Sequence, residues 1–177
     1  MLVLIGASAS GKTEIAKVLI NHYGYKKMVT YTTRKKRPGE IDGIDYHFLS
    51  EEDFLAKMKI DFFLETSKYH DHYYGTAFKD ASIDKVLIVD IQGANNIYKI
   101  LKDDVVIFFI KTPESIRKER MIARGDAFND IENRLAIDRG YFIESHLLHI
   151  DYTILNADHD LEEIALSIHQ KYRKHMD

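Results

Sequence analysis

Eight consecutive residues near the N-terminus combine small side chains with one lysine and one threonine: Gly6, Ala7, Ser8, Ala9, Ser10, Gly11, Lys12 and Thr13. The pattern G-x-x-x-x-G-K-T is typical of a P-loop, whose backbone N–H groups surround phosphate oxygens. In such a loop the lysine reaches the β- and γ-phosphates of a nucleoside triphosphate, and the threonine hydroxyl ligates Mg²⁺. The loop alone does not distinguish GTPases, ATPase motors and small-molecule kinases. The chain has no N-K-x-D guanine motif and is short for a motor, so we favour a kinase.

A dense basic run follows, with the sequence Thr32-Thr33-Arg34-Lys35-Lys36-Arg37-Pro38-Gly39-Glu40. By itself, this run could be a solvated charged turn, a nuclear-type address or a nucleic-acid patch. Two arginines separated by three positions also suit a narrower role, in which both guanidinium groups hold one phosphate. Tyr46 and the cluster Tyr73-Tyr74-Gly75-Thr76 could donate phenolic hydrogen bonds to the same oxygens.

Apolar runs and helical periodicity indicate the elements that must position these residues. Residues 2–5, 86–89 and 105–110 are uninterrupted apolar runs, as expected of strands buried on both faces. We predict helices at residues 14–22, 94–101, 114–123 and about 130–148, and a C-terminal helix that begins near Leu161. This alternation favours an α/β fold with a parallel sheet that binds ligands at the carboxyl ends of its strands. Residues 28–80 break the rhythm and are interpreted as an inserted subdomain.

Composition excludes several classes of protein. The chain has 177 residues and no cysteine, so it has no disulfides, cysteine nucleophiles or thiolate metal sites. No apolar run approaches the roughly 20 residues that a membrane span requires, and we expect a cytoplasmic protein with no membrane partner. A formal net charge of −3 disfavours nonspecific binding of nucleic acid. The sequence leaves the oligomeric state open between a monomer and a homodimer.

The chain resembles the guanylate kinase family over nearly its whole length. The resemblance rests on the order and spacing of three motifs: the P-loop, the string T-T-R-x-x-R-P-G-E-x-D-G-x-D-Y-x-F at residues 32–48, and Tyr73-Tyr74-Gly75-Thr76. The resemblance implies a P-loop kinase core of residues 1–27, 81–120 and 145–177. It also implies a GMP-binding insertion at about 28–80 and a helical lid at about 121–144. The implied reaction is ATP-dependent phosphorylation of GMP and dGMP to GDP and dGDP, with Mg²⁺ accompanying ATP.

The same resemblance assigns roles to individual residues. It implies that the GMP phosphate is held by Arg34, Arg37, Tyr46 and Tyr74. The guanine would be read by Thr30, Glu65 and Thr76, together with Asp90, which would also help to organise Mg²⁺ through water. The catalytic cations would be Lys12, Arg34, Arg124 and Arg134, and Asn156 would lie near the adenine of ATP.

Plainer interpretations remain open for some of these positions. Glu65 could be a surface carboxylate, Arg124 and Arg134 could form ordinary helix ion pairs, and Asn156 could be a turn residue. Two functional alternatives also remain. Ile88 stands where the family has an acidic residue, which motivates a kinase for another phosphorylated acceptor such as a ribose bisphosphate. The other alternative is a non-catalytic guanylate-kinase-like module that binds proteins.

Two further departures from the family pattern affect the P-loop and the lid. Ala9 replaces a P-loop glycine, and it would be strained by roughly 1 kcal/mol or more if its φ is positive. The segment between Gly125 and Arg134 is one residue shorter than usual, which leaves the register of the two lid arginines open.

Overall fold

The computed structural model describes residues 1–77, 81–157 and 160–176. The last three residues of the expected insertion and residues 158–159 and 177 of the expected core lie outside this description. The larger sheet contains five strands in the order β2-β7-β1-β8-β9, and every pairing in it is parallel. The strands are β1 (Leu2–Ile5), β2 (Lys26–Lys27), β7 (Lys85–Ile88), β8 (Val106–Lys111) and β9 (Tyr152–Leu155). The α/β fold class predicted from the sequence is therefore confirmed.

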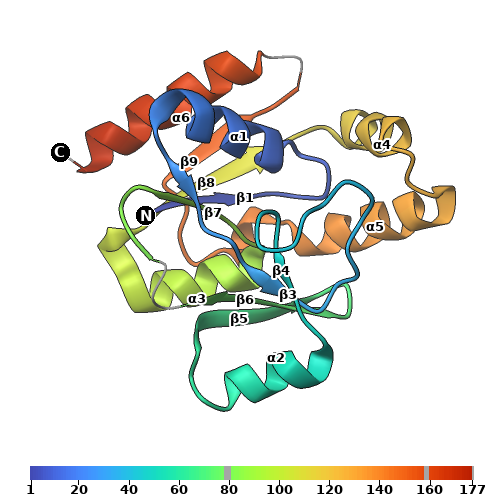
Figure 1. The fold of residues 1–177 in the computed structure, drawn as a ribbon. Coiled ribbons are helices and arrows are strands. Elements are labelled where there is room, and N and C mark those ends of the chain that lie inside the picture. The colour runs from blue at the N-terminus through green and yellow to red at the C-terminus, as the bar shows by residue number, and fades with distance from the viewer. Residues whose placement is uncertain (78–80, 158–159, 177) are drawn as a thin grey trace.

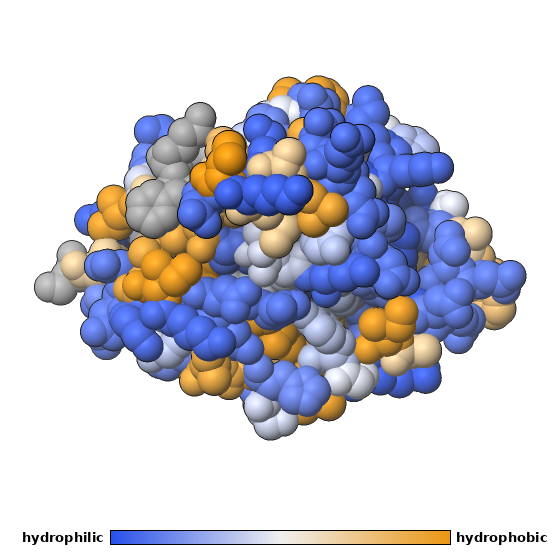
Figure 2. Space-filling view, turned by 90° about the horizontal axis from the view of Figure 1, so that it is seen from below, coloured by the Kyte–Doolittle hydropathy of each residue, from blue (hydrophilic) through white to orange (hydrophobic). Residues whose placement is uncertain are grey.

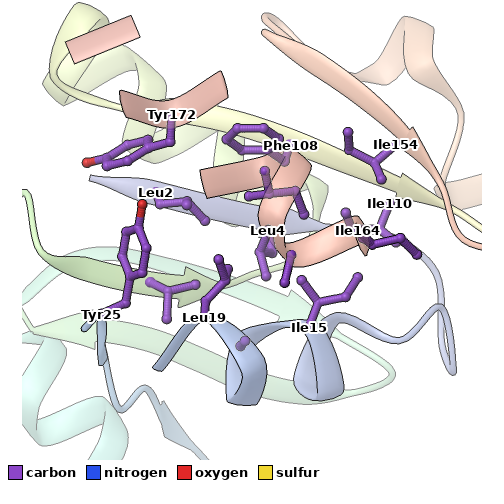
Figure 3. Close-up of a cluster of buried hydrophobic side chains, with 14 of the residues drawn as sticks. Leu2, Leu4, Ile15, Leu19, Tyr25, Phe108, Ile110, Ile154, Ile164 and Tyr172 are labelled. Atoms are coloured by element: carbon purple, nitrogen blue, oxygen red, sulfur yellow. The ribbon is translucent and has the colours of Figure 1, made fainter. Parts of the chain in front are cut away.

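Helices cover both faces of this sheet (Figure 1). Helices α1 (Lys12–Tyr23) and α6 (Leu161–Met176) lie on one face, and α3 (Ile91–Leu101) lies on the other. Side chains alternate along a strand, so β1 contributes to two cores. Leu2 and Leu4 pack with α1 and α6, as Figure 3 shows, whereas Val3 and Ile5 pack with α3. Burial on both faces explains why this strand is apolar at every position.

A second, smaller sheet lies within residues 31–77, beside the main sheet (Figure 1). Its strand order is β4-β3-β6-β5, with β3 (Tyr31–Thr32), β4 (His47–Phe48), β5 (Phe63–Tyr69) and β6 (His72–Ala77). Helix α2 (Glu51–Met58) begins after Ser50, whose hydroxyl accepts a hydrogen bond from the Asp53 N–H. Phe54 of α2 is fully buried and stacks on Phe63 and Tyr73 of this sheet. The small sheet therefore has its own apolar contacts, separate from the two clusters of the main sheet.

Helices α4 (Glu114–Ala123) and α5 (Phe128–Tyr141) form an arm at one side of the molecule (Figure 1). Short 3-10 helices follow α3 at Lys102–Asp104 and α5 at Glu144–His146. The predicted helix at 130–148 is wrong at its end, because α5 stops at Tyr141. Phe142, Leu147 and Ile150 instead pack against the α3 core as the chain returns to the edge strand β9. These tertiary contacts override an apolar spacing that would also suit a helix.

The surface is predominantly hydrophilic in the view of Figure 2, with separate hydrophobic patches. Among the described residues, no helix has the length and apolar character needed to span a bilayer.

Candidate active site

The P-loop connects β1 to α1 at the centre of the main sheet. Because β7 and β8 flank β1 on opposite sides, this loop lies where the strand order reverses, the usual ligand crevice of an open α/β sheet. A cavity of about 510 Å³ opens there between the main sheet, the small sheet and the arm. Most of the residues that the sequence singled out line it: Gly6, Ser8, Ala9, Ser10, Gly11, Lys12, Thr13, Thr30, Arg34, Arg37, Tyr46, Glu65, Tyr74, Asp90, Arg124, Arg134 and Asn156. Ala7 and Thr76 do not line the cavity. Ala7 lies between two lining residues, Gly6 and Ser8, and Thr76 pairs with the lining residue Glu65.

Two glycines of the P-loop are required by its conformation. Gly6 has a φ of 152° and Gly11 a φ of 92°. A Cβ at Gly6 would overlap the Ile110 carbonyl oxygen, and one at Gly11 would overlap the Asn156 amide nitrogen. Ala9 has a φ of 59°, so the positive φ considered from the sequence is present, at a cost of about 1–2 kcal/mol. Its methyl group packs on the buried cluster of Met121, Ile131 and Leu135.

Lys12 is folded back onto the loop from which it projects. Its ammonium donates to the carbonyl oxygens of Gly6 at 2.6 Å and Ala7 at 2.9 Å, and to the Ser10 hydroxyl at 3.3 Å. Burial lowers the pKa of Lys12 to about 8, although the nearby Asp138 and Asp90 carboxylates oppose the shift. An anion in the cavity would reverse this effect, because it would stabilise the charged ammonium.

Two arginines reach the cavity from the basic run. Arg34 donates to Glu40 at 2.7 Å and lies 5.2 Å from the centre of the Tyr46 ring. Glu40 also accepts a 2.7 Å hydrogen bond from the Arg37 backbone, so one carboxylate orders both ends of the run. Burial of Arg37 and its proximity to Arg34, Arg134 and Arg124 lower the pKa of its guanidinium. The mutual repulsion shows that these four cations converge on one region of the cavity, where a polyanion would neutralise them.

Arg124 and Arg134 share one counterion, Asp126. Arg134 donates to Asp126 at 3.1 Å, and Arg124 donates to the same carboxylate through two nitrogens. Arg124 and Asp126 are two positions apart, and Arg134 follows Asp126 by eight. The ordinary i,i+4 helix pairing considered from the sequence is therefore wrong. The Asp126 carboxylate therefore holds both guanidinium groups close together.

Buried acceptors lie at the other end of the cavity, on the small sheet. Glu65 is 5% exposed and pairs across the strands with Thr76, which is fully buried. Within the described chain, Glu65 Oε2 has no hydrogen-bond partner, and the Thr76 hydroxyl is close enough to Glu65 to favour its ionised form. Burial raises the pKa of Glu65 to about 8, opposed by Thr76 and reinforced by Asp90. Glu65 is thus no surface carboxylate, and its orphaned oxygen indicates a ligand with hydrogen-bond donors. Thr30 is also buried and lines the same cavity.

Asp90, at the end of β7, forms hydrogen bonds that stabilise the fold. One of its oxygens accepts a 2.8 Å hydrogen bond from the Gly93 N–H and so caps α3, and the other accepts from the Ser67 hydroxyl at 2.8 Å. No cluster of three or more acidic or histidine ligands that could hold a metal by itself exists among residues 1–77, 81–157 and 160–176. Thr13 and Asp90 nevertheless suit Mg²⁺, which usually takes one or two protein oxygens and completes its shell with phosphates and water.

Asn156 is fully buried and supports the P-loop directly. Its amide donates to the Ser10 carbonyl oxygen at 2.8 Å, and its Oδ1 accepts from Arg120 at 3.3 Å. Arg120 also donates to the Ala9 carbonyl oxygen at 3.4 Å. Asn156 is therefore more than a turn residue, because it links the end of β9 to the phosphate loop.

The sequence reasoning missed Asp138, which is 2% exposed and contacts the P-loop. Its carboxylate accepts a 2.8 Å hydrogen bond from the Ser8 N–H. It also forms an ion pair at 3.0 Å with Arg117, which is buried as well. A signal was present in the sequence. Ile131, Leu135 and Asp138 follow the i, i+4, i+7 spacing of one helix face, so an acidic residue occupied a core position and required a buried partner.

Comparisons with known proteins agree with this geometry. Residues 1–174 match the guanylate kinase family model. The guanylate kinase of Pseudoalteromonas translucida is 34% identical over 168 residues, which cover 90% of this chain and 81% of the relative. That of Acinetobacter baylyi is 32% identical, with coverages of 99% and 92%.

Solved structures give the same result. The guanylate kinase of Anaplasma phagocytophilum superposes with a TM-score of 0.76 at 26% identity, covering 100% of this chain and 86% of the other. A gluconokinase from Sinorhizobium meliloti, 16% identical with a TM-score of 0.54 and coverages of 98% and 91%, shares the fold alone. With a family model matched over nearly its full length and well-covered relatives above 30% identity, this chain belongs to the guanylate kinase family.

Proposed function

We propose that this chain transfers the γ-phosphoryl group of ATP to GMP, and likewise to dGMP, and releases ADP and GDP or dGDP. The observation that carries the assignment of the acceptor is the buried Glu65 Oε2, which has no hydrogen-bond partner in the described chain and lies on the residue opposite Thr76. Guanine offers N1–H and an exocyclic amine as neighbouring donors, whereas adenine has no N–H at N1. A carboxylate that accepts from both would reject adenine, because its buried oxygens would remain unpaired.

The two phosphate-bearing substrates would meet between Glu65 and the P-loop. Arg34 and Arg37 would hold the acceptor phosphate, with Tyr46 and Tyr74 adding neutral donors. This requires Arg34 to exchange part of its contact with Glu40 for the ligand. Loss of one carboxylate contact is offset by a phosphate that offers more oxygens and more charge.

The P-loop would bind the donor nucleotide. Its backbone N–H groups and the N-terminus of α1 would face the phosphates, and Lys12 would leave the Gly6 and Ala7 carbonyl oxygens to reach them. Arg124 and Arg134, gathered by Asp126, would neutralise charge on the transferring group. A dianionic acceptor phosphate is already a nucleophile, so the reaction needs positioning and charge neutralisation and no general base.

Mg²⁺ would be held by the Thr13 hydroxyl, the nucleotide phosphates and water, with Asp90 in its outer shell. When bound with ATP it would supply additional positive charge to the phosphates. Asn156 would keep the loop in shape near the adenine side of the site.

A coupled assay for ADP release tests the proposal. Purified protein with ATP and Mg²⁺ is offered GMP, dGMP, AMP, CMP, UMP, a ribose bisphosphate or no acceptor. We expect release with GMP and dGMP only, and Glu65→Gln should narrow the preference for GMP over AMP by at least tenfold. Release with the sugar phosphate alone would reassign the acceptor, and no release with any acceptor would favour a binding role.

A further inference from the structure

Asp138 of α5 is a fully buried carboxylate that joins three parts of the molecule. One oxygen accepts from the Ser8 N–H of the P-loop and from Arg117 of α4. The other oxygen accepts a hydrogen bond from the hydroxyl of Tyr69, the last residue of β5 in the small sheet. The proposed reaction assigns no role to this residue. Burying a carboxylate costs desolvation free energy unless hydrogen bonds and an opposite charge compensate for it.

The charge of Asp138 is satisfied where it stands. Burial raises the pKa of its carboxyl, but contacts with His70, Tyr69, Ser8 and Arg117 together bring that pKa below its usual range. Arg117 also donates to the Ser8 carbonyl oxygen at 3.3 Å, so the ion pair holds both sides of the same P-loop residue. The carboxylate thus remains ionised and fixed against the loop.

Tyr69 reaches this carboxylate from a tight hairpin. Tyr69 pairs with His72, and the two intervening residues, His70 and Asp71, have φ values of 48° and 61°. Such turns favour asparagine and glycine, so this hairpin is strained. The Tyr69 ring also packs on Tyr141 and Phe142 at the end of α5, with centroids 5.1 and 5.9 Å away. A strained turn persists where surrounding contacts hold it.

The strand that ends at Tyr69 carries the acceptor-reading residue. Glu65 lies four residues upstream on β5, in the same antiparallel hairpin as Tyr74 and Thr76 of β6. Ser67 and Thr66 of β5 are hydrogen-bonded to Asp90 and Asn96 beside and on α3, whereas Tyr69 links the same strand to a carboxylate that contacts the phosphate loop.

We propose that the hydrogen bond between Tyr69 and Asp138 is a latch that positions the acceptor-binding sheet against the P-loop. Tyr69 and Asp138 are positioning residues in this account. The inference rests on the proposed function, since it assigns the latch to the phosphoryl transfer described above.

Tyr69→Phe tests the latch because it removes one hydroxyl and keeps the ring. Tyr98→Phe is the matched control, since Tyr98 is a partly buried tyrosine of α3 that stacks on His149 and is not among the residues that line the cavity. We expect Tyr69→Phe to raise KM for GMP about tenfold or more, as for loss of a charge-assisted hydrogen bond. KM for ATP and the melting temperature should stay near those of Tyr98→Phe. Equal rises in both KM values with a lowered melting temperature, or no change, would overturn the proposal.

Hydrogen exchange and a double-mutant cycle complete the test. In the nucleotide-free protein, Tyr69→Phe should accelerate amide exchange in peptides spanning residues 63–77, and unchanged exchange would refute the latch even if no substrate were turned over. Failure of the proposed function would instead leave the wild-type protein without GMP-dependent ADP release. Asp138→Ala combined with Tyr69→Phe should raise KM for GMP no further than Asp138→Ala alone, because alanine leaves the Tyr69 hydroxyl without its acceptor. Additive effects would show that the two residues act separately.

Discussion

The raised pKa of Glu65 predicts how the affinity for GMP depends on pH. Burial raises the pKa of this carboxyl to about 8 in the unliganded protein, with Asp90 reinforcing the shift and Thr76 opposing it. The proposed contact with guanine needs the ionised form, because both donors of the base require acceptors. At any pH below about 8, binding of GMP must therefore first remove a proton from Glu65, and the affinity for GMP should fall as the pH is lowered.

The magnitude follows from the ionised fraction. With a pKa of about 8, roughly one Glu65 in ten is ionised at pH 7 and one in a hundred at pH 6. The apparent affinity is reduced by that fraction, which corresponds to about 1.4 kcal/mol at pH 7 and about 2.7 kcal/mol at pH 6. Above pH 8 the penalty disappears.

Calorimetric titration with GMP, without ATP, measures this effect from pH 6 to pH 9. Glu65→Gln is the reference, because the phosphate of GMP also titrates near pH 6 and affects both proteins equally. The ratio of the two dissociation constants should change about tenfold per pH unit between 6 and 8 and then become constant. At pH 7, repeating the titration in buffers of different ionisation enthalpy should reveal close to one proton released by the wild-type protein in excess of the variant.

A ratio that stays constant between pH 6 and pH 8, with no excess proton release, would show that GMP binding does not remove a proton from Glu65. Either Glu65 would then be ionised before GMP binds, or it would not contact the base.

Three substitutions test other parts of the site and fold. Lys12→Ala should lower kcat about a hundredfold or more while the dissociation constant for GMP stays within a few-fold, and an unchanged kcat would remove Lys12 from the reaction. Gly11→Ala should weaken ATP binding at least tenfold, because the new Cβ would overlap Asn156 and the φ of 92° disfavours alanine. Titration of the variant with ATP measures this loss, and an affinity equal to that of the wild-type protein would contradict it. Phe54→Ala should reduce the free energy of unfolding by about 3–5 kcal/mol in denaturant titrations, since Phe54 is fully buried between aromatic rings, whereas a loss below about 1 kcal/mol would mean that the small sheet repacks.

Much of the fold was predictable because its signals are local. The apolar runs at β1, β7 and β8 are continuous since both faces of the sheet are covered, and the helix at residues 114–123 has the bounds that periodicity predicts. The P-loop motif and the string at residues 32–48 likewise identified side chains that the fold brings to one cavity. The domain boundaries, the role of each site residue and the oligomeric state remain predictions.

Other features depend on contacts between distant segments. Periodicity extended α5 to Leu148, whereas docking of Phe142 and Leu147 on the α3 core ends it at Tyr141. Asp138 was overlooked because its partners, Ser8 and Tyr69, are 130 and 69 residues away in the sequence. Asn156 contacts the P-loop across a comparable separation, which no local pattern reveals.

Phosphorus NMR of a mixture of the protein, ATP, Mg²⁺ and GMP would follow phosphoryl transfer to GMP itself, because it separates transfer from hydrolysis. We expect the β-phosphate signals of ADP and GDP to grow in equal amounts while ATP and GMP decline together. Unchanged spectra, or inorganic phosphate and ADP without GDP, would contradict it.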